Sequence, residues 1–267
     1  MHLLWSWLTT LVFLPVFGLV LSGFELAQRL AYAIGQRPQE YVAGALQWAL
    51  VQTIRICGTR FVVERAPAVR PRASYIIVSN HQSMFDIPIL GALFFSNFPK
   101  YISKKSLARG IPSVSYNLRR GGHVLIDRGD APAALVAIRE LGRRVAAGDC
   151  SAMIFPEGTR ARHGELGAFK PAGLMALLEE APAVPLVPVA IDESWRLLRH
   201  NFLPVPWGVR VRVHVGTPIE RRSDENRRSL VEQVRAEIDG VLGRWRGGVG
   251  PPAGRAAPAG SDAARQS

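Results

Sequence analysis

A histidine and an aspartate five residues apart are the best candidates for chemistry in this sequence. They lie in residues 80–86, which read Asn-His-Gln-Ser-Met-Phe-Asp. His81 supplies a base that works near neutral pH, and Asp86 is suited to orient its ring and stabilise its charged form. The spacing alone leaves a second interpretation open, in which His81 caps a helix or fills a turn.

A second polar block follows about seventy residues later, where residues 155–160 read Phe-Pro-Glu-Gly-Thr-Arg. It comes directly after a predicted strand, and loops at the carboxyl ends of strands are where α/β proteins bind ligands. The planar guanidinium of Arg160 suits a phosphate group. The block also allows a plain surface salt bridge between Glu157 and Arg160.

The elements that must position these residues alternate between short apolar runs and helical stretches. This alternation predicts an α/β domain with a mostly buried central sheet flanked by helices. The predicted strands are Phe61–Val63, Tyr75–Val78, Val124–Ile126, Ala152–Phe155, Leu186–Ile191 and Val209–Val215. The predicted helices are Ala131–Ala147, Gly173–Glu180 and the amphipathic segment Asp224–Trp245, with a further helix beginning near Ile87.

The N-terminus carries an apolar segment, Leu3–Phe24, without a charged residue. About twenty residues of helix rise roughly 30 Å, enough to cross a hydrocarbon core. A signal peptide would have a basic start and a shorter apolar run, so we expect a retained membrane anchor that Pro15 kinks. The more polar stretch Tyr41–Cys57 is expected to lie in the interface, to pack on the first helix, or to be a buried helix of the soluble domain.

These features divide the chain into an N-terminal membrane-anchoring helical segment (1–58), an α/β catalytic domain (59–246) and a disordered tail (247–267). The formal net charge of +12 favours a polyanionic partner. The sequence has no nucleic-acid-binding motif, which leaves an anionic lipid surface. Cys57 and Cys150 are expected to be free, buried thiols of a reducing compartment, and no metal site is predicted.

Four segments together resemble the motifs of the glycerolipid acyltransferase family, typified by 1-acylglycerol-3-phosphate acyltransferases. In chain order they are residues 80–86, 122–128 (Gly-His-Val-Leu-Ile-Asp-Arg), 155–160 and 184–189 (Val-Pro-Leu-Val-Pro-Val). Lys104–Leu107 and Phe169–Lys170 resemble further segments of the family. The chain departs from the family pattern at Ala161, at Pro171–Gly173 and at Ser113–Tyr116, which leaves the acceptor open.

The resemblance implies transfer of a fatty acyl group from a thioester to the sn-2 hydroxyl of lysophosphatidic acid, giving phosphatidic acid. His81 would deprotonate the hydroxyl, and Asp86 would orient His81. Glu157 would hold an arginine in place or accept from a hydroxyl, while Ser83 is a less favoured nucleophile. The substrate-binding residues that the resemblance implies are Lys105, Arg128, Glu157, Gly158, Thr159, Arg160 and Lys170.

No cofactor is implied, since acyl-CoA or acyl carrier protein serves as the donor substrate. Because that thioester is cytosolic, we expect the catalytic domain at the cytoplasmic face of a membrane, with membrane lipids and a lysolipid as its partners. Three alternatives stay open: acylation of another lysolipid such as a lyso-ornithine lipid, hydrolysis of a thioester or lipid, and lipid binding without catalysis.

Overall fold

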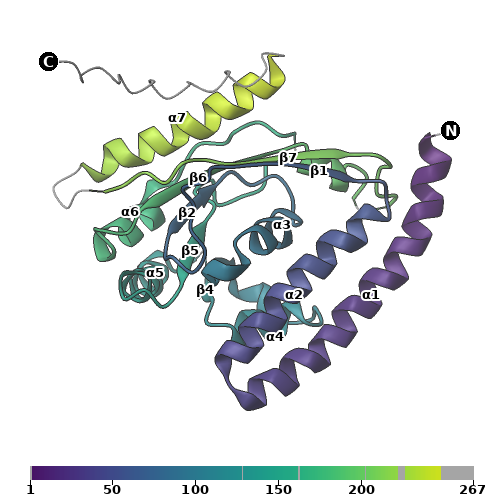
Figure 1. The fold of residues 1–267 in the computed structure, drawn as a ribbon, viewed down its shortest axis with the longest axis horizontal. Coiled ribbons are helices and arrows are strands. Elements are labelled where there is room, and N and C mark those ends of the chain that lie inside the picture. The colour runs from purple at the N-terminus through teal and green to yellow at the C-terminus, as the bar shows by residue number, and fades with distance from the viewer. Residues whose placement is uncertain (1, 128, 162, 202, 222–225, 248–267) are drawn as a thin grey trace, which may run out of the picture.

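A seven-stranded mixed sheet forms the centre of the protein (Figure 1). The computed structural model describes residues 2–127, 129–161, 163–201, 203–221 and 226–247. Its strands are β1 (Arg60–Arg65), β2 (Ile76–Ser79), β3 (Pro99–Lys104), β4 (Val124–Ile126), β5 (Ser151–Ile154), β6 (Leu186–Asp192) and β7 (Arg210–Val215). The order across the sheet is β1-β7-β6-β2-β5-β3-β4, and every neighbouring pair is parallel except β6 and β7. The carboxyl ends of the five parallel strands β6, β2, β5, β3 and β4 therefore lie at the same edge of the sheet.

Helices cover both faces of this sheet. The helices are α1 (His2–Ile34), α2 (Gln36–Arg55), α3 (Asp86–Leu93), α4 (Val114–Arg120), α5 (Ala131–Ala146), α6 (Pro171–Glu180) and α7 (Arg227–Arg246), with short 3-10 helices η1 (Phe95–Asn97), η2 (Lys105–Ala108) and η3 (Ser194–Leu198). Side chains of α2 and α3 and Phe13 of α1 pack on one face. Side chains of α5, α6 and α7 pack on the other. The α/β prediction is confirmed, and burial on both faces explains the apolar strands.

The six predicted strands are present, but β3 and α4 were missed. β3 begins with a proline and contains Lys100, Ser103 and Lys104, so it lacks the apolar run of a buried strand. Lys100 is nevertheless buried, because its Nζ donates to Glu40 Oε1 (2.5 Å) and to the Gly121 carbonyl (2.7 Å). A tertiary partner from α2 thus permits a charge inside the sheet.

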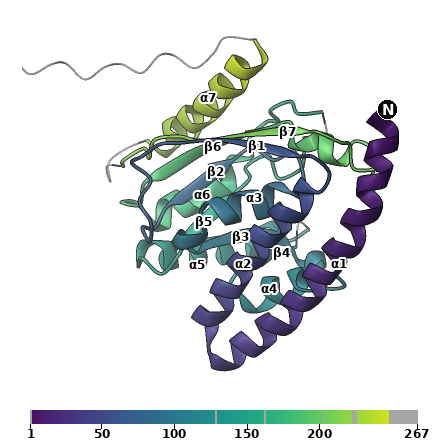
Figure 2. The same cartoon turned by 45° about the vertical axis from the view of Figure 1, so that its right-hand side comes forward.

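The first two helices form an antiparallel hairpin along one side of the domain (Figure 2). α2 packs on α1, as one of the interpretations of Tyr41–Cys57 predicted. α1 continues through Pro15, and among the described helices it alone is long and apolar enough to cross a membrane. Its outer side exposes large apolar side chains: Leu3, Leu4, Trp5, Trp7, Leu8, Leu11, Val12, Leu19, Leu26 and Leu30.

Two sequence expectations outside the sheet have different outcomes. Cys57 and Cys150 are both unpaired and buried, as expected. The predicted tail, 247–267, lies outside the described residues apart from Gly247, which follows the last turn of α7.

Candidate active site

The loop between β2 and α3 holds the polar residues of the first motif. Asn80 fixes the start of this loop, since its amide donates to the Ile191 carbonyl and accepts from the Ile191 N–H, both at 2.8 Å. The side chain thus pairs with β6 as a strand residue would. The loop is attached to the neighbouring strand just before His81.

His81 and Asp86 form a hydrogen-bonded pair across this loop. The distance between His81 Nδ1 and Asp86 Oδ2 is 2.8 Å. Five residues do not bring two side chains together on one helix face, but the turn that ends at the first residue of α3 does. Asp86 is fully buried, whereas 15% of the His81 side chain is exposed. His81 Nε2 has no partner among the described residues, so it is the nitrogen left to take a proton.

Asp86 is held as an acceptor by four donors. Its Oδ2 accepts from His81 and from the backbone N–H groups of Gln82 (2.6 Å) and Ser83 (2.8 Å). Its Oδ1 accepts from Ser194 Oγ at 2.6 Å. These hydrogen bonds fix the carboxylate beside His81, where it can stabilise an imidazolium. Sequence reasoning missed Ser194, whose sole signal was a hydroxyl two residues after a strand.

The third motif holds the backbone of His81 in place through hydrogen bonds. Glu157 Oε1 accepts from the His81 N–H (2.7 Å), and the His81 carbonyl accepts from the Ala161 N–H (2.7 Å). Glu157 Oε2 accepts from the Gly167 N–H at 2.8 Å. The side chain is buried, and this burial raises the pKa of Glu157, although both N–H donors oppose the shift.

This contact pattern gives Glu157 a positioning role that the sequence did not suggest. The sequence suggested that it holds an arginine, accepts from a substrate hydroxyl, or pairs with Arg160 at the surface. In the described part of the chain its two oxygens instead accept from backbone N–H groups, and Arg160 is exposed. The reason is that β2 and β5 are neighbours, so the turn after β5 lies against the loop after β2.

The rest of the third motif forms a tight turn with exposed polar groups. Gly158 has φ +68°, a left-handed conformation that favours glycine. A Cβ at this position would lie 3.7 Å from Lys170 Nζ, so the Lys170 side chain lies over the turn. Thr159, Arg160 and Lys170 are exposed. A phosphate at this edge of the sheet can therefore reach two cations close to His81.

One of the other predicted ligand residues, Lys105, lies further along the same edge. Lys105 is exposed at the start of η2, directly after β3. β5 separates β3 from β2, so Lys105 is two strands away from the loop of His81. Arg128 follows β4 and lies outside the described residues.

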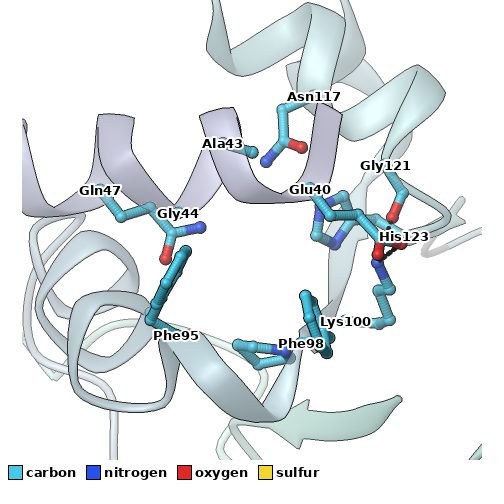
Figure 3. A pocket seen from close by; sticks show the side chains of 12 residues that line it. Glu40, Ala43, Gly44, Gln47, Phe95, Phe98, Lys100, Asn117, Gly121 and His123 are labelled. Carbon is cyan, nitrogen blue, oxygen red and sulfur yellow. Dashed lines mark hydrogen bonds and ion pairs between the residues drawn. The ribbon is translucent and has the colours of Figure 1, made fainter. Parts of the chain in front are cut away.

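His123 of the second motif points away from this edge into a small cavity beneath α2 (Figure 3). Its Nδ1 accepts from the Tyr101 N–H at 3.0 Å. Burial, with Lys100 and Arg144 nearby, lowers the pKa of His123 to about 3. The space measures about 30 Å³, room for one or two waters. We interpret this part of the second motif as structural.

Other nucleophiles are poorly placed. Ser83 is fully buried, and its Oγ accepts from the Phe85 N–H. Burial raises the pKa of the Cys57 thiol to about 11. Among the described residues, no group of three or more His, Cys, Asp or Glu is arranged to hold a metal ion. The exposed nitrogen of His81 is thus the group best placed to act on a bound hydroxyl.

The sequence matches the family model described as Acyltransferase over residues 60–192, which include the His81–Asp86 pair and the Glu157 turn. It is 31% identical to an uncharacterized acyltransferase of Schizosaccharomyces pombe, over 76% of this chain and 72% of that protein. The chain belongs to the acyltransferase family.

Other members of this family carry more specific names. A 1-acyl-sn-glycerol-3-phosphate acyltransferase of Cocos nucifera is 32% identical over 60% of this chain, which spans about half (49%) of that protein. The crystal structure of the 1-acyl-sn-glycerophosphate (LPA) acyltransferase PlsC from Thermotoga maritima has the same fold. It superposes with a TM-score of 0.70 at 24% identity and covers 92% of this chain and 99% of that one.

Proposed function

We propose that this acyltransferase moves a fatty acyl group from a thioester donor to the sn-2 hydroxyl of lysophosphatidic acid, giving phosphatidic acid. The observation that carries the proposal is the 2.8 Å contact between His81 Nδ1 and Asp86 Oδ2. It leaves Nε2 to act as a base at an edge of the sheet that also carries the exposed cations Arg160 and Lys170. Relatives named for this reaction support the choice of acceptor.

During the reaction His81 accepts one proton and later releases it. Nε2 takes the proton of the acceptor hydroxyl while the oxygen attacks the thioester carbonyl carbon. Asp86 accepts from Nδ1 and stabilises the imidazolium. The C–S bond then breaks, and the imidazolium returns the proton to the leaving thiolate. Because the hydroxyl of Ser83 is buried, direct transfer is favoured over an acyl-serine intermediate.

The acceptor phosphate is proposed to bind at the turn after β5. Arg160 and Lys170 are exposed there, and Glu157 fixes the turn against His81. A phosphate held by an arginine fork would keep the lipid hydroxyl within reach of Nε2. In our proposal Lys105 and Arg128, which follow β3 and β4 in the sequence, add positive charge for the phosphate, and Gly158 and Thr159 contact it at the turn.

α1 is proposed to hold the domain at a membrane with its length along the surface. Ser6 and Thr10 accept from the N–H groups of Trp207 and Val205, and at the other end Gln28 donates to Ser113. Ser6 and Gln28 are about 33 Å apart along the helix, as far as a hydrocarbon core is thick. A helix that contacts one domain at both ends fits an interfacial position better than the predicted crossing.

The test is a substrate panel with the purified wild-type protein. Labelled acyl-CoA or acyl carrier protein is offered with lysophosphatidic acid, a lyso-ornithine lipid or lysophosphatidylcholine, and products are separated. The proposal predicts that lysophosphatidic acid is acylated fastest. Faster acylation of another lysolipid would overturn the acceptor, and release of free fatty acid alone would make the protein a hydrolase. Domain orientation is tested separately, since protease protection in inside-out vesicles would contradict the cytoplasmic face.

A further inference from the structure

A cationic pocket lies on the other side of the His81–Asp86 pair from the third motif. It has a volume of about 290 Å³ and is lined by Glu193, Arg196, Arg199, Pro206, Trp207, Gly208, Val209 and Arg210. We call it the arginine pocket. Glu193 in its lining directly precedes Ser194, whose hydroxyl donates to Asp86. Its volume is at the lower end of small-molecule sites, enough for a headgroup.

The topology of the sheet concentrates positive charge here. β7 runs antiparallel to β6, so its first residue, Arg210, lies beside the turn that follows β6. β1 runs parallel to β7, and Arg60 is the direct register partner of Arg210. Like charges opposite one another on neighbouring strands are destabilising. An anion bound in the pocket beside Arg210 would reduce this repulsion.

The charges in the pocket are not balanced. Arg196 pairs with Glu193 at 2.6 Å. In the part of the chain that the structure describes, neither Arg199 nor Arg210 has a carboxylate partner, and both are exposed. Three arginines against one glutamate leave 3 − 1 = +2 on the lining. Guanidinium groups bind phosphate in a bidentate manner, so a phosphate ester is the ligand class that fits.

The side of the pocket next to α1 is apolar and aromatic. Trp207 packs against Trp5, with ring centroids 6.1 Å apart, and the two residues are 40% and 50% exposed. The backbone N–H of Trp207 donates to Ser6 Oγ, which fixes this wall to α1. Exposed tryptophans beside basic side chains are typical of the headgroup region of a membrane. Further exposed apolar residues follow Trp5 along α1, among them Trp7, Leu8 and Leu11.

We propose that the arginine pocket binds the phosphate of an anionic phospholipid in the bilayer, whose acyl chains lie along the N-terminal half of α1. Arg199 and Arg210 hold the phosphate, while Trp5 and Trp207 lie at the depth of the headgroups. This lipid is a docking ligand, distinct from the acceptor at Arg160 and Lys170. It sets the height of the His81–Asp86 pair above the membrane surface.

The experiment measures binding of the full chain to vesicles of phosphatidylcholine with and without 30% phosphatidylglycerol. The test variant is Arg199→Gln with Arg210→Gln. The control is Arg228→Gln with Arg235→Gln, which removes the same charge from the exposed side of α7, away from α1 (Figure 1). Each basic residue at an anionic surface is worth about a factor of five. The test variant should therefore bind anionic vesicles about 30-fold more weakly, and the control within about threefold of wild type.

Several outcomes would overturn the proposal. One is equal loss of binding in the two double variants, which would indicate only a general effect of charge. Another is unchanged vesicle binding together with a raised KM for acyl-CoA in detergent, which would assign the arginines to the phosphates of the donor. Thermal unfolding checks that the variants fold, and Arg199→Gln alone, expected to bind about fivefold more weakly, repeats the test with a smaller change. Vesicle binding needs no turnover, so failure here is separable from failure of the proposed reaction.

Discussion

Glu157 offers a sharp test of how the third motif acts. Its two oxygens accept from the N–H groups of His81 and Gly167 at 2.7 and 2.8 Å. Glutamine has one acceptor oxygen, so in Glu157→Gln one N–H faces the NH2 group whichever way the amide turns. The variant loses one hydrogen bond to a buried carboxylate, worth about 1.5–3 kcal/mol.

If the lost hydrogen bond is the one that positions His81, and its full free energy is lost from the transition state, kcat decreases about ten- to a hundredfold, since 1.36 kcal/mol corresponds to a factor of ten. The KM for lysophosphatidic acid should stay within about threefold, because a residue that positions the base contributes little to acceptor binding. The assay is steady-state acyl transfer with the acceptor concentration varied. A matched control is Glu165→Gln, an exposed glutamate of the same loop, expected to keep wild-type kinetics.

Two results would refute this reasoning about Glu157. A raised KM for the acceptor with unchanged kcat would mean that the carboxylate contacts the substrate, as the sequence first suggested. Wild-type kcat and KM in a folded Glu157→Gln protein would mean that the hydrogen bond between Glu157 and the His81 N–H has no consequence for the reaction. The thermal midpoint of unfolding is recorded in parallel, because the lost hydrogen bond also lowers the free energy of unfolding.

Two further predictions concern Ser194 and His123. Ser194→Ala removes one of four donors to Asp86, so kcat should decrease about tenfold while the KM for the acceptor stays unchanged. Ser194→Thr should restore part of the lost activity. Wild-type kcat in the alanine variant would contradict this prediction. The pKa of His123 is lowered to about 3 from an ordinary value of 6.5, so the unfolded state binds its proton first and stability is lost as pH falls below 6.5. Between pH 7 and 5 the free energy of unfolding should decrease by about 2 kcal/mol because of His123. Urea unfolding of His123→Asn should not show this decrease. An equal decrease in the variant would assign the acid sensitivity to another group.

The sequence predicts the elements of this protein better than their contacts. β2, β5 and β6 are runs of apolar residues because both of their faces are covered, and such runs are visible without a structure. β3 was missed because the partner that allows Lys100 to be buried, Glu40, is sixty residues away in α2. Tertiary pairing of this kind leaves no local pattern.

The same limit applies to the site. The spacing of His81 and Asp86 suggested their contact, and the structure places them at hydrogen-bond distance. The contacts of Glu157 with backbone N–H groups were missed because they depend on β5 lying next to β2. Ser194 was missed because its bond to Asp86 joins residues 108 positions apart. Contacts between loops follow from strand order, which the motifs alone do not give.

The central claim, that His81 paired with Asp86 is the base for acyl transfer, is tested most directly by one measurement. Purified wild type, His81→Ala and Asp86→Asn are assayed for transfer of a labelled acyl group from acyl-CoA to lysophosphatidic acid, after circular dichroism shows that each is folded. General-base catalysis contributes about 10²–10⁴-fold, so His81→Ala should lose at least a hundredfold in kcat. Asp86→Asn keeps the shape without the charge and should also lose most activity. Turnover near the wild-type rate in folded His81→Ala would contradict the account.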